Sequence, residues 1–156
     1  MRISNLPPYC LSTKNKEIVE SILNKFSSII QKRIVGGKLT IKIPIMLVKD
    51  RAGYQIGPHT DLPARLVSLL FYLPPNSDIE ARGTSVYIPK DRGFSSDGSV
   101  HHDRRDFDLV ETVPFRMNSV VFFPRTERSF HGVELIPDAG IERDCMLVNI
   151  MQGSAA

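Results

Sequence analysis

The sequence predicts a mainly β domain, a sandwich or barrel, with one helix packed outside it. Apolar side chains recur at helical spacing only near the N-terminus, within residues 13–33. From residue 38 onward, short runs rich in β-branched and aromatic residues replace that pattern. Turn-forming residues separate these runs by short connections, which suit mostly antiparallel strands. One leading helix followed by at least six strands indicates this fold class.

The predicted helix covers residues 13–33, "TKNKEIVESILNKFSSIIQKR". Its apolar residues form one stripe, at positions 18, 19, 22, 23, 26, 29 and 30. Thr13 or Asn15 can cap its N-terminus, and the glycines of "VGGK" end it. We interpret the stripe as a face that packs on the β core, not as a partner-binding surface.

Six runs predict the strands of a β core over residues 38–151. In chain order they are "LTIKIPIMLVK", "RLVSLLFYLP", "TSVYIP", "SVVFFP", "FHGVELI" and "CMLVNIM". The longest polar interruption, residues 90–108, reads "KDRGFSSDGSVHHDRRDFD". Loops of this length are usually functional or disordered. We expect this segment to overhang the candidate site and to be more mobile than the strands.

Size and composition fit one globular domain over residues 1–156. Its 20 basic and 17 acidic residues are interleaved along the chain and give a net charge of +3. This pattern does not indicate a basic surface that binds nucleic acid. No apolar run approaches the roughly 20 residues that span a bilayer, and no signal-peptide pattern begins the chain. Cys10 and Cys145 form no paired framework and are predicted to be small buried hydrophobes. We expect a cytoplasmic protein.

The four histidines of the chain include one pattern typical of a metal site. His59 and Asp61 lie two residues apart, so in an extended segment they point to the same face. His131 follows Asp61 by 70 residues, and barrel closure can bring it to them. Such a set is the facial triad of non-haem Fe(II) oxygenases, although a zinc hydrolase can use the same ligands. His101 and His102 are interpreted as an exposed basic loop, with a second metal site as the alternative.

Arg143 separates these interpretations. It lies twelve positions after His131, and alternation along the last strand gives it one face with Cys145, Leu147 and Asn149. An arginine that faces into a barrel is costly unless an anion pairs with it. Its planar guanidinium can bind a carboxylate through two parallel hydrogen bonds. A dicarboxylate could reach the metal with one end and Arg143 with the other. Pairing of Arg143 with Glu142 or Asp144 is the ordinary alternative.

With His59, Asp61, His131 and Arg143 in this order, the sequence resembles the Fe(II)- and 2-oxoglutarate-dependent oxygenases. This superfamily has the double-stranded β-helix, or jelly-roll, fold. The resemblance covers roughly residues 41–151 and includes prolyl-4-hydroxylase-like and phytanoyl-CoA-hydroxylase-like members. "YQIGPHTD", "RLVSLLFYLP", "GTSVYIP", "NSVVFFPR" and "SFHGV" carry it. The family often has serine or threonine where this chain has Cys145, and a glycine pair where it has "RGT". The motif H-x-D, a distant H and a later R corresponds here to His59, Asp61, His131 and Arg143.

The resemblance implies a jelly roll with the N-terminal helix outside, Fe(II) on the triad, and 2-oxoglutarate and O₂ as co-substrates. Arg143 would bind the far carboxylate of 2-oxoglutarate, with Tyr54 and Ser68 as further candidates for its carboxylates. The reaction would hydroxylate a C–H bond and release succinate and CO₂. Asp61 favours hydroxylation or demethylation, because halogenating relatives have a small residue in its place.

Other classes stay open. A cupin-like jelly roll that binds metal without oxidation, as a sensor, isomerase or hydrolase, explains the histidines but gives Arg143 no role. A catalytic core trimmed from a longer protein also fits. Arg125 and Arg128 are expected in a solvated turn, with contact to an acidic substrate as the alternative. The mixed charges of residues 90–108 fit a peptide, a sugar nucleotide, a lipid head group or a small metabolite. No membrane or nucleic-acid partner is expected.

Overall fold

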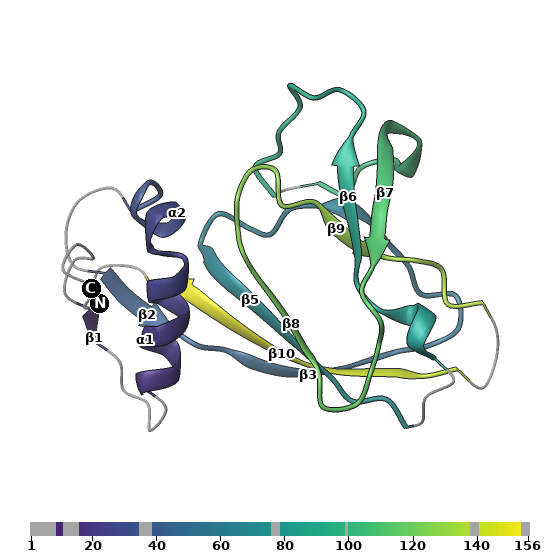
Figure 1. Cartoon of the computed structure of the whole chain (residues 1–156), viewed down its shortest axis with the longest axis horizontal. Coiled ribbons are helices and arrows are strands. Elements are labelled where there is room, and N and C mark those ends of the chain that lie inside the picture. The colour runs from purple at the N-terminus through teal and green to yellow at the C-terminus, as the bar shows by residue number, and fades with distance from the viewer. Residues whose placement is uncertain are drawn as a thin grey trace.

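Two β-sheets face each other, and two helices pack on the outer side of the larger sheet (Figure 1). The helices are α1 (Lys16–Lys25) and α2 (Ser27–Gln31), and short 3₁₀ turns lie at η1 (Glu80–Arg82) and η2 (Arg104–Asp106). The computed structural model describes residues 9–10, 16–34, 39–75, 79–98, 100–137 and 141–153.

The larger sheet has a long central strand, which pairs with neighbours along both edges. Its order is β1 (Tyr9–Cys10), β2 (Leu39–Lys42), β10 (Arg143–Gln152), β5 (Arg65–Tyr72) and β8 (Val120–Pro124). The last two residues of β10 pair with β2, and its first six residues pair with β3 (Ile45–Asp50). The smaller sheet has the order β4 (Ile56–His59), β9 (His131–Val133), β6 (Ser85–Pro89) and β7 (Phe107–Thr112).

From β3 onward the chain crosses repeatedly between the two sheets. Strands β3, β5, β8 and β10 belong to the larger sheet, and β4, β6, β7 and β9 belong to the smaller one. Apart from the short parallel pair β1–β2, the pairings are antiparallel. The fold is a double-stranded β-helix. The predicted fold class is therefore confirmed.

The helices cover one end of the larger sheet. Their stripe forms a core with β2, β5 and β10, made of Val19, Leu23, Ile30, Ile41, Leu66, Val67, Leu69 and Ile150. The single predicted helix is wrong in one respect, because the chain leaves helical geometry at Phe26. There the Phe26 ring packs edge-on against Phe122 of β8, with ring centroids 5.9 Å apart. The predicted caps Thr13 and Asn15 lie outside the described residues.

One strand prediction needs correction, and the strands β4 and β7 were not predicted. The first run is two strands, because Pro44 has no N–H for the ladder and instead accepts a hydrogen bond from Asn149 N at 3.1 Å. The short strand β4 contains Gly57 and Pro58, which read as loop residues. The strand β7 begins inside the predicted loop and is mostly exposed, so its sequence lacks clear apolar alternation.

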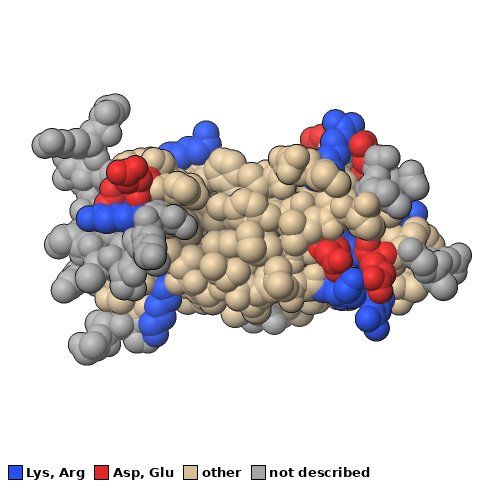
Figure 2. Space-filling view, turned by 90° about the horizontal axis from the view of Figure 1, so that it is seen from below, with Lys and Arg blue, Asp and Glu red and all other residues tan. Residues whose placement is uncertain are grey.

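Beyond the helices, the outer face of the larger sheet is apolar and exposed. On β3, Ile45 and Leu47 are 62% and 78% exposed, and on β8 Val120 and Phe122 are also exposed. Seen from below, this side of the molecule has a broad area without charged side chains (Figure 2). Within the described chain, no helix is long and apolar enough to cross a membrane.

Candidate metal centre and its cavity

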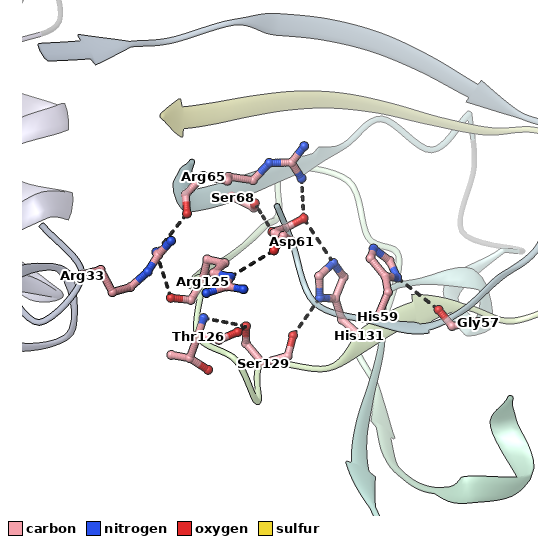
Figure 3. A network of polar contacts seen from close by, with 10 residues as sticks. All are labelled: Arg33, Gly57, His59, Asp61, Arg65, Ser68, Arg125, Thr126, Ser129 and His131. Carbon is pink, nitrogen blue, oxygen red and sulfur yellow. Dashed lines mark hydrogen bonds and ion pairs between the residues drawn. The ribbon is translucent and has the colours of Figure 1, made fainter. Parts of the chain in front are cut away.

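The three predicted metal ligands meet where β4 and β9 pair. His59 ends β4 and His131 begins β9, and the two lie directly opposite each other in the antiparallel register. Their ring centroids are 4.4 Å apart. Asp61 follows His59, and donor atoms of all three lie within 4.8 Å of one another (Figure 3). Among the described residues, no other group of three His, Cys, Asp or Glu side chains converges in this way.

Backbone carbonyls orient both imidazoles. The Nδ1 of His59 donates to the Gly57 carbonyl at 3.1 Å, and the Nδ1 of His131 donates to the Ser129 carbonyl at 3.0 Å. This leaves each Nε2 without a proton and free to bind a metal. Burial, and then the neighbouring imidazole of His131, lower the pKa of His59 to about 4. Burial also lowers the pKa of His131, so both rings are in the neutral form that a metal requires.

Asp61 is almost fully buried, and both of its carboxylate oxygens have partners. Arg65 forms an ion pair with Oδ1, and the hydroxyl of Ser68 donates to Oδ2 at 2.5 Å. The same Oδ1 lies 3.9 Å from Nε2 of His131. Oδ1 is therefore the oxygen that faces the imidazoles, and Arg65 supplies a positive charge beside it.

Two further arginines support the backbone around Asp61 (Figure 3). Arg125 is buried, and its Nε donates to the Asp61 carbonyl at 3.0 Å. Its expected position in a solvated turn is therefore wrong, whereas Arg128 is exposed. Arg33, just after α2, donates to the carbonyls of Arg65 at 2.9 Å and Arg125 at 3.1 Å. Arg33 thus ties the helical end to the strands that carry the site.

The segment of residues 90–108 packs directly over the ligands, as predicted. The N–H of His102 donates to the Pro58 carbonyl at 2.8 Å, and the hydroxyl of Thr60 donates to the Ser96 carbonyl at 3.2 Å. Gly98 has a φ of +90°, and a Cβ there would lie 2.1 Å from the Asp61 carbonyl oxygen. Only glycine permits this close approach. The greater mobility of the segment stays a prediction.

The adjacent histidines of this segment point to different surroundings. The exposed His101 ring lies 4.7 Å from the His59 ring, measured between centroids. The His102 ring instead contacts the rings of Phe94, Phe107 and Phe130. The two therefore do not act as a pair, and the exposed His101 lies beside His59 of the predicted metal centre.

A cavity of about 200 Å³ between the sheets contains the triad at one end. Several residues that the sequence singled out line it together, namely Tyr54, Ser68, Arg143 and Cys145, and Arg65 joins them. Burial raises the pKa of Tyr54, so its hydroxyl keeps its proton. Burial likewise raises the pKa of Cys145 to about 11, which keeps the thiol neutral. Arg65 and Arg143 therefore supply the positive charge of the cavity.

Arg143 forms a buried ion pair with Asp50, which lies directly opposite it in the register of β10 and β3. The two side chains are 3% and 2% exposed. Only Nη1 of the guanidinium is used, and Nε and Nη2 are buried without a hydrogen-bond partner. The alternative of a surface pair with Glu142 or Asp144 is wrong, since both of these bind Lys49.

Asp50 is the residue of the site that sequence reasoning missed. Burial raises the pKa of its carboxyl, and the charge of Arg143 opposes this effect. A weak signal was present, because alternation from Val48 places Asp50 on the inner face of β3. Its partner could not be read from the sequence, because Arg143 lies 93 residues away and the pairing depends on strand register.

No protein-family model matches this sequence, and no curated protein matches it. Solved structures similar to it include a Pseudomonas putida prolyl-4-hydroxylase, at 21% identity over 71% of this chain and 51% of that chain, with a TM-score of 0.44. A 2OG-Fe(II) oxygenase family protein from Burkholderia pseudomallei shares 13% identity over 94% of this chain and 60% of that chain, with a TM-score of 0.47.

A protein of Bacillus endospore appendages, which form disulfide-linked pili, is also similar. It shares 16% identity over 78% of this chain and 96% of that chain, with a TM-score of 0.38. The chain thus spans little more than half the length of the two oxygenases. Similarity this distant includes proteins of different function, so the function must be argued from the side chains of the site.

Proposed function

We propose that the protein is an Fe(II)- and 2-oxoglutarate-dependent dioxygenase that hydroxylates a C–H bond of its substrate. The free edge of Arg143, in the same cavity as the three ligands, carries this proposal. Nε and Nη2 form one edge of the planar guanidinium, which suits two parallel hydrogen bonds to a carboxylate. Buried donors without a partner are costly, and the far carboxylate of 2-oxoglutarate would satisfy both of them.

The donor set fits Fe(II). Two neutral imidazoles and one carboxylate on one face leave coordination positions for a bidentate co-substrate and O₂. The chemistry that Fe(II) supplies when bound is O₂ activation coupled to decarboxylation of 2-oxoglutarate to succinate and CO₂. The resemblance to such oxygenases in the motifs around His59, Asp61 and His131 supports the same choice.

The charges in the cavity favour a dianion together with a divalent metal. Its acidic and basic lining residues are Asp50, Asp61, Arg65 and Arg143, whose formal charges cancel. A divalent cation alone would leave two positive charges in a buried site, and 2-oxoglutarate carries two negative ones. The complex of protein, metal and co-substrate is then neutral, which limits the cost of burying its charges.

The polar groups around the cavity have separate roles in this proposal. Arg143 binds the far carboxylate through its free edge, and the hydroxyl of Tyr54 donates a hydrogen bond in the same region. Ser68 holds Asp61 in place through Oδ2 and presents its side chain to the co-substrate from β5. Residues 90–108 cover the ligands and exclude water from the reacting atoms.

The substrate is proposed only as a class with an accessible C–H bond. The carboxylate of Asp61 occupies the place that a halide would need, which favours hydroxylation, or demethylation through an unstable hydroxymethyl product. Substrate would enter beside the exposed His101. A peptide, a sugar nucleotide, a lipid head group and a small metabolite remain the candidates to screen.

Release of succinate from 2-oxoglutarate tests the proposed reaction. The purified protein, supplied with Fe(II), ascorbate and O₂, should release succinate above background, and a true substrate from a panel of these four classes should increase the rate. Arg143→Ala should lose this turnover, whereas Arg128→Ala, a change at an exposed arginine, should keep it. Equal succinate release by Arg143→Ala and the unchanged protein would contradict the proposed role of Arg143.

A further inference from the structure

Asp50 is held in the co-substrate cavity by strand pairing. It ends β3, faces the first residue of β10 in the register, and lines the cavity with Arg143. Because both side chains are almost fully buried, the carboxylate cannot swing into solvent when another anion enters. A ligand carboxylate on Arg143 must therefore share the guanidinium with Asp50.

The shared guanidinium limits the geometry of that ligand. Asp50 uses Nη1, and the unpartnered edge is formed by Nε and Nη2. The rings of Phe115 and Tyr72 lie 5.1 and 5.8 Å from the guanidinium carbon of Arg143, so aromatic groups flank it. Nε and Nη2 are thus the two donors left for a ligand carboxylate, since Nη1 already binds Asp50.

The shared guanidinium also limits the charge of that ligand. An Asp50 oxygen on Nη1 and the oxygens of a ligand on the Nε–Nη2 edge would lie roughly 5 Å apart, given ordinary hydrogen-bond lengths. At that distance, each extra unit of like charge weakens binding by a factor of about ten or more at the effective dielectric of a protein site. Arg143 carries one positive charge, which Asp50 already balances, so a second negative charge on the ligand group meets the repulsion of Asp50 without further compensation from this pair.

We propose that Asp50 is a specificity-determining residue, which restricts the far end of the co-substrate to a single carboxylate and rejects a doubly charged group. This inference rests on the proposed function, because it assumes that 2-oxoglutarate binds at Arg143. It goes further by assigning the choice between two anions to Asp50. Arg143 supplies attraction for either anion, and Asp50 supplies the discrimination.

The test compares two ligands on two proteins. The ligands are 2-oxoglutarate and its analogue with a phosphonate in place of the far carboxylate, compared at a pH high enough for the phosphonate to carry both of its negative charges. Calorimetry measures the dissociation constants with Mn(II)-loaded protein without O₂, so no turnover is needed. The unchanged protein should prefer the carboxylate, and Asp50→Asn should shift the ratio of the two constants at least tenfold toward the phosphonate. Glu111→Gln, a change at an exposed carboxylate outside the segment 90–108, should leave the ratio unchanged.

The ratio of the two dissociation constants separates a change in selectivity from damage to the fold. Partial unfolding of a variant lowers the apparent affinity for both ligands by the same factor. Asp50→Ser retains a hydroxyl acceptor for Nη1 and replaces Asp50→Asn if that variant does not fold. An unchanged ratio in the variant, with 2-oxoglutarate still bound by the unchanged protein, overturns the role of Asp50 alone. Absence of 2-oxoglutarate binding by the unchanged protein overturns the proposed function and this inference together.

Discussion

The two faces of the larger sheet differ in a way that reverses the usual distribution of charge. On β3, Val48 and Asp50 point into the cavity, whereas Ile45 and Leu47 point outward and are exposed. Soluble proteins normally bury apolar groups and expose charges. Here buried charges gather at one place inside the barrel, while part of the outer face is apolar. Burying charge is costly, which supports our proposal that the inner face is the functional one.

The largest effect should come from removing a metal ligand on the inner side. His59→Ala should abolish binding of Mn(II) or Co(II), because two remaining donors do not hold a divalent metal firmly. Binding of 2-oxoglutarate should be lost with it. His101→Ala is the matched control, since its ring adjoins His59 but is outside the converging group, and it should retain the metal. Calorimetric metal titration measures both, and equal metal affinity in the two variants would remove His59 from the ligand set.

Arg143 should give the next largest effect, on the co-substrate alone. Arg143→Ala should leave metal affinity nearly intact but weaken 2-oxoglutarate binding by about 3–5 kcal/mol, because it removes one partner of a buried charge pair. Arg143→Lys should recover only part of this loss, since a point charge cannot reproduce the fork. The metal-to-ligand charge-transfer absorbance of the Fe(II) complex follows the binding. Full affinity in Arg143→Ala would move the anion site elsewhere, with Arg65 the next residue to test.

A smaller effect should appear in the pH dependence of stability. In metal-free protein His59 has a pKa of about 4 against an ordinary 6.5, so between these values the unfolded chain binds a proton that the folded chain does not. Stability should be complete above pH 6.5 and fall by about 2 kcal/mol between pH 7 and pH 5. Urea denaturation in a chelator measures this fall, and His59→Asn should reduce it. A pH-independent free energy of unfolding would contradict the neutral, buried state of the ring.

The smallest effect should come from the outer face of the same sheet. Leu47 is 78% exposed, so Leu47→Ser should change the free energy of unfolding by less than about 0.5 kcal/mol. It should also leave the affinities for metal and 2-oxoglutarate unchanged. Denaturant titration and calorimetry check the two statements. A large loss of either affinity would show that the two faces of the sheet are not independent.

The sequence predicted those parts of the molecule that depend on local pattern. The helical stripe, the β-rich runs and the inner face shared by Arg143 and Cys145 follow from spacing alone, and the structure confirms them. The three ligands could be proposed because their types and order are distinctive. Strands β4 and β7 were missed, because one contains glycine and proline and the other is exposed.

The rest depends on contacts between distant segments. The role of Asp50 depends on its pairing with Arg143, which the strand register sets. Arg125 is buried because it donates hydrogen bonds to the carbonyls of Asp61 and Ser96, which belong to other parts of the chain. Neither contact has a local signal. Ser68, proposed as a co-substrate contact, is found donating to Asp61, and its contact with the co-substrate stays a prediction.

Titration of the protein with 2-oxoglutarate, with and without metal, tests the central claim most directly. With Mn(II) bound and O₂ excluded, calorimetry should show one molecule of 2-oxoglutarate per chain, and a chelator should weaken that binding strongly because the metal anchors one end of the ligand. Absence of binding with metal present would contradict the account. Binding of equal strength with and without metal would also contradict it, because the triad and Arg143 would then not act on the same ligand.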